Sequence, residues 1–174
     1  MSTGSDSNSG ASTIRQALSD ADYAFAGELF REYATQLRVD LCFQGFDAEL
    51  QSLAATYGPP SGCLLLAHLG DAPVGCVGVR QLATGRCELK RLYVRDLARG
   101  HGLGLALTKA AIRAAQKADY QSMVLDTLAQ MKAARQLYAG LGFREIAAYY
   151  HNPIEGTTYF ELDLTKWEQG RRYE

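Results

Sequence analysis

The clearest candidate for chemistry in this sequence is the loop Arg99-Gly100-His101-Gly102-Leu103-Gly104, which follows a predicted strand and opens a predicted helix. Glycines allow backbone N–H groups to converge on one point, and the N-terminus of a helix adds partial positive charge there. Such a loop can bind a phosphate group without a lysine, and Arg99 adds a charge beside it. The alternative interpretation is a flexible strand-to-helix turn without a ligand.

Three known phosphate-binding patterns can be compared with this loop. The P-loop pattern Gly-x-x-x-x-Gly-Lys-Ser/Thr is absent from the sequence. The dinucleotide pattern Gly-x-Gly-x-x-Gly fits at Gly100 and Gly102, but Leu105 occupies the third glycine position. The third pattern, Arg/Gln-x-x-Gly-x-Gly/Ala, is met by Arg99, Gly102 and Gly104. A dinucleotide-dependent oxidoreductase is therefore disfavoured.

The position of this loop depends on the strands and helices around it. The spacing of apolar residues along the sequence predicts where these elements lie. Three short apolar runs joined by tight turns predict an antiparallel meander, and the helix after the loop predicts a parallel crossover. We therefore expect an α/β (α+β) fold with a mixed, mainly antiparallel sheet and helices on both faces. The predicted elements are strand 13–18, helix 20–39, helix 47–58, strands 62–69, 74–82 and 86–94, helix 102–118, strand 122–127, a helix that contains residues 131–141, and strands 143–150 and 157–164.

Polar side chains mark the predicted starts of the first two helices. Ser19 is a suitable N-cap for the first helix, with Asp22 three residues later. Asp47 is predicted to cap the second helix, which must end before Pro59 and Pro60.

Composition excludes several classes of protein. The chain has 174 residues, which suits one domain, and its 18 basic and 19 acidic residues give a net charge of −1. The net charge therefore predicts no broad basic surface for nucleic acid, with a local basic patch as the alternative, and no apolar run reaches the ~20 residues of a membrane helix. The four cysteines form no Cys-x-x-Cys pair and the three histidines are dispersed, so we expect free thiols, no metal and a cytoplasmic location. Polar tails are expected at 1–12 and 166–174, around a domain at 13–165.

Several features together resemble the GNAT superfamily of N-acetyltransferases. The spacing of Arg99, Gly102 and Gly104 matches its pyrophosphate loop, and the run LKRLYV before the loop resembles its fourth strand. The run ARQLY at 134–138, followed by Gly142-Phe143, resembles a second signature. The predicted order of elements also matches this family from residue 13 to residue 164.

The resemblance implies that acetyl-CoA lies where the fourth and fifth strands splay apart. Its pyrophosphate would meet the amides of the loop formed by Arg99, Gly100, His101, Gly102, Leu103 and Gly104. Its pantetheine would pair with the backbone of Leu92, Tyr93 and Val94 like an added strand. The N–H of Leu92 would then polarise the thioester carbonyl, as in an oxyanion hole.

The resemblance also implies two catalytic side chains. Glu88 lies where some members of the family place a glutamate that accepts the proton of the attacking amine through water. Its alternative role is an ion pair with Lys90, on the same face of the strand. Tyr138 resembles the tyrosine that protonates the leaving thiolate, and its alternative role is packing on the face that it shares with Met131 and Leu141.

The resemblance implies that the acceptor is an amine of a small molecule or of a peptide. Relatives build its pocket from the first two helices and the late loop, which here carry Arg38, Asp40, Phe43, Tyr149, Tyr150, His151 and Asn152. Aromatic rings and an acid suit a small cationic amine, although an ordinary loop with half-buried tyrosines is equally consistent with these residues. The leading interpretation is an acetyl-CoA-dependent N-acetyltransferase, and a homodimer is compatible with it. The alternative is a non-catalytic acyl-CoA-binding regulatory module of the same fold.

Overall fold

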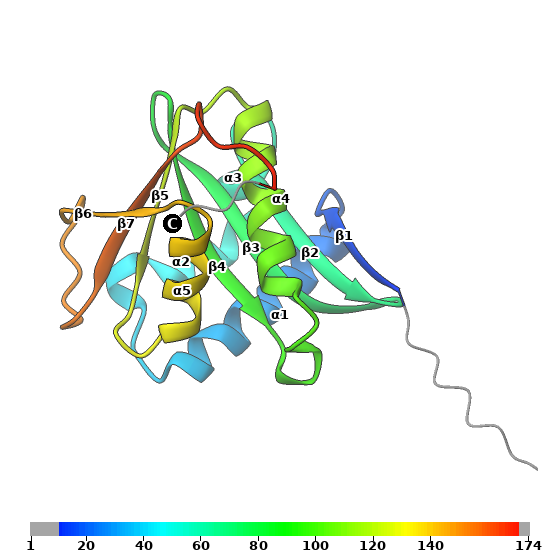
Figure 1. Cartoon of the computed structure of the whole chain (residues 1–174). Coiled ribbons are helices and arrows are strands. Elements are labelled where there is room, and N and C mark those ends of the chain that lie inside the picture. Colours follow the sequence, from blue (N-terminus) through cyan, green and yellow to red (C-terminus); the bar gives the residue numbers. More distant parts are fainter. Residues whose placement is uncertain (1–10, 171–174) are drawn as a thin grey trace, which may run out of the picture.

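A seven-stranded sheet in the order β1-β2-β3-β4-β5-β7-β6 forms the centre of the protein (Figure 1). The computed structural model describes residues 11–170, so most of the predicted N-terminal tail and the last four residues lie outside the description. The strands are β1 (Ser12–Gln16), β2 (Cys63–Leu69), β3 (Ala72–Ala83), β4 (Arg86–Val94), β5 (Ser122–Thr127), β6 (Arg144–Ile146) and β7 (Thr158–Asp163). The helices are α1 (Asp20–Leu37), α2 (Phe46–Gln51), α3 (Leu53–Tyr57), α4 (Leu103–Lys117) and α5 (Lys132–Gly140).

The predicted mixed sheet is confirmed. Strands β1 to β4 form an antiparallel meander, and α4 makes the crossover to β5, which pairs with β4 in parallel. The last strands return antiparallel, so that β7 lies between β5 and β6. Among residues 11–170, no helix combines the length and the apolar character that spanning a bilayer requires.

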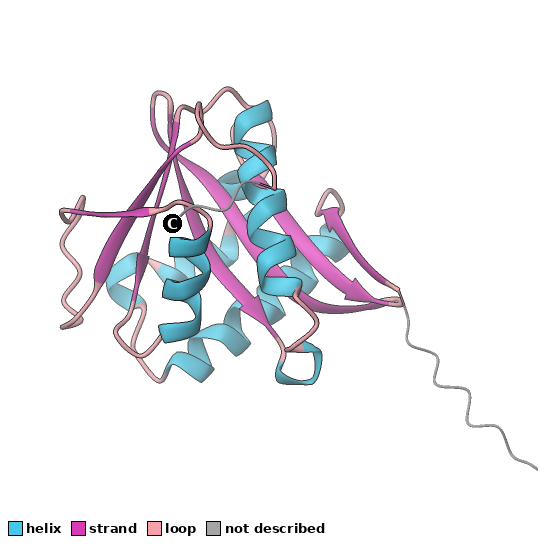
Figure 2. Cartoon of the chain, in the orientation of Figure 1, coloured by secondary structure: helices cyan, strands magenta, loops and turns pink. Residues whose placement is uncertain are grey.

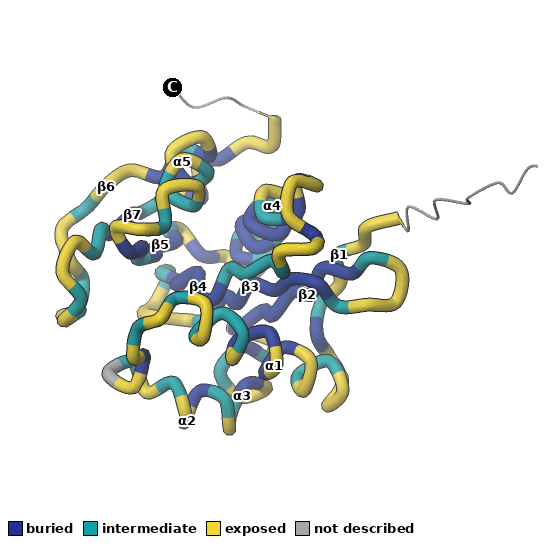
Figure 3. Tube along the Cα trace, turned by 90° about the horizontal axis from the view of Figure 1, so that it is seen from below, coloured by how far each residue is buried: buried dark blue, intermediate teal, exposed yellow. Residues whose placement is uncertain are grey.

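Helices cover both faces of the sheet (Figure 3). One face packs against α4 and α5 and contains Leu65 and Met123, whereas the other packs against α1 and α3 and contains Leu64 and Leu66. Consecutive leucines of β2 thus serve opposite cores, as the two-residue period of a strand requires. Each face of the central strands is therefore apolar, and a charged side chain there needs a partner.

The first helix begins as predicted. The Ser19 hydroxyl accepts a hydrogen bond from the Asp22 N–H (3.2 Å), and the Asp22 carboxylate accepts one from the Ser19 N–H (3.1 Å). This reciprocal capping box satisfies two N–H groups that the helix itself leaves unpaired. Arg38, in a left-handed conformation with φ 54°, is the C-cap, so the helix ends at Leu37, two residues before the predicted boundary.

The predicted helix 47–58 is helical and ends before Pro59 as expected, but its predicted cap and its continuity are wrong. The N-cap is Gly45, whose φ of 68° reverses the chain after a short 3₁₀ turn, and no side chain caps the helix there, so that Asp47 lies inside the first turn. The helix also breaks at Ser52, which leaves the helical conformation (φ −134°, ψ 33°) and divides the segment into α2 and α3.

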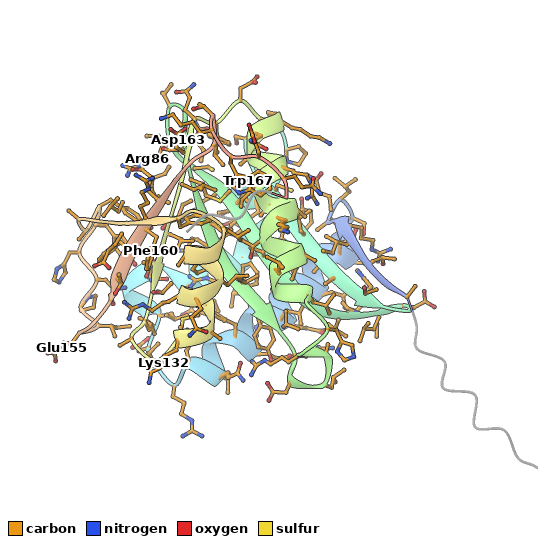
Figure 4. The ribbon with its side chains drawn as sticks, in the orientation of Figure 1. Arg86, Lys132, Glu155, Phe160, Asp163 and Trp167 are labelled. Carbon is orange, nitrogen blue, oxygen red and sulfur yellow. The ribbon has the colours of Figure 1, made fainter. Side chains whose placement is uncertain are left out.

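The C-terminal part also differs from the prediction. The expected strand 143–150 is reduced to β6, and an irregular loop follows it (Figure 2). The rings of Tyr149 and Tyr150 instead lie 5.4 and 5.6 Å from that of Tyr159 in β7, and this packing turns the chain away from the sheet edge. Beyond the predicted domain end at 165, Trp167 is buried beside α4 (Figure 4), and its carbonyl accepts a hydrogen bond from Gln116.

Candidate active site

The central strands separate at the point where the resemblance places the cofactor. The parallel pairing of β4 with β5 ends at Glu88 and Val124, and beyond it the two strands diverge (Figure 1). The pairing of β4 with β3 shifts register between Lys90 and Tyr93, and Arg91 adopts a φ of 59° there. Two residues of β4 thus oppose one of β3, which is a β-bulge. On the side toward β5, the last residues of β4 have no strand partner in the described part of the chain.

A cavity of about 520 Å³ occupies this separation. Its walls come from α1, the end of β4, the loop after β4 and the first turns of α5, which begins at Lys132 (Figure 4). Of the predicted cofactor residues, the structure brings five to this cavity: Leu92, Tyr93, Val94, Arg99 and Gly104.

The glycine-rich loop is open at its surface. Gly100 and Gly102 have φ values of 82° and 71°, and a Cβ atom built on either of them, or on Gly104, would meet no atom within 4 Å. Gly102 is also the N-cap of α4 and makes no side-chain cap. The first amide groups of this helix therefore face solvent, in the arrangement that suits a bound anion.

The other members of the loop have structural contacts. Arg99 donates hydrogen bonds to Gln36 (2.7 Å) and to the carbonyl of Val94 (3.1 Å), so it links α1 to β4 across the cavity mouth. His101 Nδ1 lies 3.1 Å from the carbonyl of Arg99, and Leu103 is buried under α4. His101 and Leu103 do not line the cavity, and neither do Gly100 and Gly102.

A smaller polar cavity of about 30 Å³ adjoins the first, and both are lined by Tyr33, Leu37, Leu92 and Met131. We call it the polar chamber. Tyr138 lines it and is 3% exposed, with its ring 5.4 Å from that of Phe143. Burial raises the pKa of Tyr138 far above its ordinary value, and the nearby Tyr33 and Asp126 raise it further. The phenol is therefore protonated and can serve as a hydrogen-bond donor.

Glu88 is buried, and both of its carboxylate oxygens accept hydrogen bonds. One carboxylate oxygen accepts hydrogen bonds from Arg80 (Nε 2.8 Å, Nη2 2.7 Å), and the other accepts one from the Tyr149 hydroxyl (2.8 Å). Lys90 Nζ lies 3.9 Å away, so the ion pair anticipated for this strand face is present, although Arg80 is much closer. Glu88 is not among the residues that line the polar chamber.

Arg91 and Glu49 form a second buried pair beside the polar chamber. Arg91 donates two hydrogen bonds to the Glu49 carboxylate (3.1 and 2.6 Å), and Tyr57 donates a third (2.5 Å). Burial raises the pKa of Glu49, but the hydrogen bonds and charge of Arg91 outweigh it and leave the pKa below its ordinary value. This pair holds the bulge of β4 against α2.

Sequence reasoning missed Asp126. It lies near the end of β5, lines the polar chamber, and accepts hydrogen bonds from Tyr150 (3.0 Å) and Asn152 (3.2 Å). An acidic residue near the carboxyl end of a strand that leaves its parallel partner was a usable signal.

The predicted acceptor residues divide into two groups. Tyr149, Tyr150 and Asn152 reach the carboxylates of β4 and β5, whereas Arg38, Asp40 and His151 are exposed on the surface. The side chain of Phe43 lies outside the described residues.

Comparisons with known proteins agree with this geometry. The sequence profile described as the acetyltransferase (GNAT) family matches residues 26–143. An uncharacterized N-acetyltransferase of Schizosaccharomyces pombe is 44% identical over 79% of this chain and 86% of its own length. The N-acetylaspartate synthetase of Rattus norvegicus is 36% identical over 58% of this chain, which is 34% of that protein. The structure of a putative acetyltransferase from Salmonella typhimurium with its cofactor acetyl-CoA has a TM-score of 0.65, with 22% identity over 88% of this chain and 94% of that one.

Proposed function

The chain belongs to the acetyltransferase (GNAT) family, and we propose that it transfers an acetyl group from acetyl-CoA to a primary amine by direct attack. One observation carries this proposal. The 520 Å³ cavity joins an open glycine loop at a helix N-terminus to a strand edge that has no partner strand. A phosphate group and an extended amide chain are the two parts of coenzyme A that such a cavity fits.

In this proposal, the loop amides from Arg99 to Gly104 bind the pyrophosphate, and Leu92, Tyr93 and Val94 pair with the pantetheine. The acetyl group then reaches the polar chamber, because Leu92 lines both cavities. The relative from Salmonella typhimurium, which has acetyl-CoA as its cofactor, supports this choice of donor.

The chemistry proposed is a single acyl transfer. The neutral amine attacks the carbonyl carbon of the thioester, a C–N bond forms, and the C–S bond breaks. The N–H of Leu92 stabilises the negative charge on the carbonyl oxygen, which is worth ~3 kcal/mol in comparable sites. The amine loses one proton to a base, and the thiolate gains one from Tyr138.

The two proposed catalytic groups, Tyr138 and Glu88, differ in their position relative to the polar chamber. Tyr138 lines the polar chamber, which the acetyl group enters in this proposal. Glu88 has both oxygens engaged by Arg80 and Tyr149. As the proposed proton acceptor, it therefore acts through a water molecule or through the Tyr149 hydroxyl, and not by direct contact with the amine.

The acceptor proposed is the amine of a small molecule. The polar chamber is small, so only the reacting end of an acceptor enters it. The relatives named N-acetylaspartate synthetase support an amino acid as the acceptor, although this chain spans only about a third of their length.

The first test is calorimetry with acetyl-CoA, combined with detection of released coenzyme A over a panel of amines. Gly102→Glu places a negative charge at the proposed pyrophosphate site, and Gly102→Ala is its matched control, because both substitutions strain the same positive φ. We expect Gly102→Glu to abolish binding and Gly102→Ala to weaken it less. Binding without transfer to any amine would instead indicate a non-catalytic acyl-CoA-binding module.

A further inference from the structure

The charged groups around the polar chamber are mostly paired with each other. Arg80 pairs with Glu88, and Arg91 pairs with Glu49, with shortest N–O distances of 2.7 and 2.6 Å. The polar chamber has two further charged groups on its wall, one cation and one anion, which come from different strands. They are Lys90 of β4 and Asp126 of β5.

Lys90 is a buried cation with weak partners. Its side chain is 5% exposed, and the nearest acceptors of its ammonium group are Gln44 Oε1 at 3.5 Å and Glu88 Oε1 at 3.9 Å. Arg80 and Tyr149 approach Glu88 more closely than Lys90 does. An ammonium group has three N–H donors, and burying such a charge without close acceptors is costly. Lys90 therefore keeps donor capacity on the wall of the polar chamber.

Asp126 has a carboxylate oxygen that is free to accept a hydrogen bond from a ligand. Its Oδ2 atom accepts hydrogen bonds from Tyr150 and Asn152, while no donor in the described part of the chain is within hydrogen-bonding distance of Oδ1. Lys90 and Asp126 influence each other electrostatically, yet no ion pair within 4.0 Å joins them among the described residues. Lys90 and Asp126 thus line the same cavity and form no ion pair with each other.

We propose that the acceptor is a free amino acid, whose carboxylate binds Lys90 and whose amino group binds Asp126. This inference rests on the proposed function and names its substrate class. A zwitterion matches both charges, places its nitrogen on the β5 side of the chamber near the acetyl group, and gives Lys90 a closer anionic partner than the 3.9 Å contact with Glu88. A diamine or polyamine would set a second ammonium group against Lys90, and like charges at such a site repel strongly.

The test compares each L-amino acid with its own carboxamide, which has the same side chain and no carboxylate. We expect the wild-type protein to prefer the acid in kcat/KM by about 10- to 100-fold, the effect of one charge-assisted hydrogen bond. The amide has the more easily deprotonated amine, so intrinsic reactivity works against this expected preference. Equal rates for acid and amide would overturn the inference.

Variants of Lys90 assign the preference to this residue. Lys90→Met keeps the length of the side chain and removes its charge, so KM for the acid should rise about 10-fold or more while kcat/KM for the amide stays within about 3-fold. Lys90→Arg should retain the preference, and Lys117→Met, at an exposed position at the end of α4, is the matched control. An equal loss for acid and amide in Lys90→Met, with acetyl-CoA binding retained, would contradict the proposal.

The panel also separates this inference from the proposed function. It includes polyamines and a lysine-containing peptide besides the amino acids. Product from these amines but not from amino acids would overturn the inference and leave the acetyltransferase function intact. No product from any amine would overturn both. If Lys90→Met does not fold, the comparison of acid with amide in the wild-type protein still decides the substrate class.

Discussion

Replacing Glu49 by glutamine tests whether the buried ion pair holds the bulge of β4 in place. Glu49 and Arg91 are 7% and 5% exposed, and three hydrogen bonds of 2.5 to 3.1 Å converge on the carboxylate. Removing one partner of such a pair leaves a buried charge uncompensated and costs ~3–5 kcal/mol. Glutamine still accepts one hydrogen bond, so we expect a loss of about 3 kcal/mol in the free energy of unfolding.

The expected effect is large enough to measure by thermal unfolding. In a chain of this size each kcal/mol lowers Tm by about 2–4 °C, so Glu49→Gln should lower it by about 6–12 °C. The matched variant combines Glu49→Gln with Arg91→Met, which also removes the guanidinium charge that Glu49→Gln leaves without a partner. Because replacing a whole buried pair by apolar groups is often neutral, this double variant should regain more than half of the loss.

The same pair predicts a pH dependence. The pKa of Glu49 is lowered in the folded protein, so the pair contributes stability above the ordinary pKa of a glutamate, ~4.3, and loses it as the pH falls through the lower folded value. Glu49→Gln should therefore flatten the decline of Tm below pH 5. A loss of less than about 1 kcal/mol at neutral pH, the value of an exposed ion pair, would refute this account of the bulge.

Three further substitutions test the remaining assignments. Tyr138→Phe should leave acetyl-CoA affinity unchanged and lower kcat by about 100-fold, and an unchanged kcat would remove its role as the acid. Glu88→Gln should lower kcat by about 100-fold if Glu88 accepts the proton. A loss of stability alone in that variant would assign Glu88 to the ion pair with Arg80. Ser19→Ala removes the capping hydroxyl of α1 and should cost ~1 kcal/mol, or about 2–4 °C in Tm, with activity unaffected.

Local patterns in the sequence were sufficient for much of the fold. Strands β4 and β5 have the predicted bounds, because turn residues flank alternating or apolar runs on both sides. The cap at Ser19 was also predictable, since all its atoms lie within four residues of one another. The family resemblance located the cavity, because the spacing of the glycines is typical of a loop whose backbone must approach a ligand closely.

Long-range packing decided what the sequence could not predict. Nothing near Ser52 marks the break between α2 and α3, and the shortening of β6 follows from the contact of Tyr149 and Tyr150 with Tyr159, which lies in another strand. The positive φ of Arg91 depends on Glu49, 42 residues away in the sequence. Asp126 was missed because its importance depends on where β4 and β5 separate.

The bulge in β4 explains why one strand can supply both a structural ion pair and the wall of the site. Before the bulge, Cys87 and Leu89 belong to the core beneath α4, and after it Leu92 and Val94 pack against that same core. The alternation of the strand is therefore shifted by one residue, as a bulge requires. Its consequence is that Lys90 and Arg91, although consecutive, both reach Gln44 on the opposite face. Because Arg91 takes the Glu49 carboxylate there, Lys90 is left without a close acid and keeps its charge available to the polar chamber.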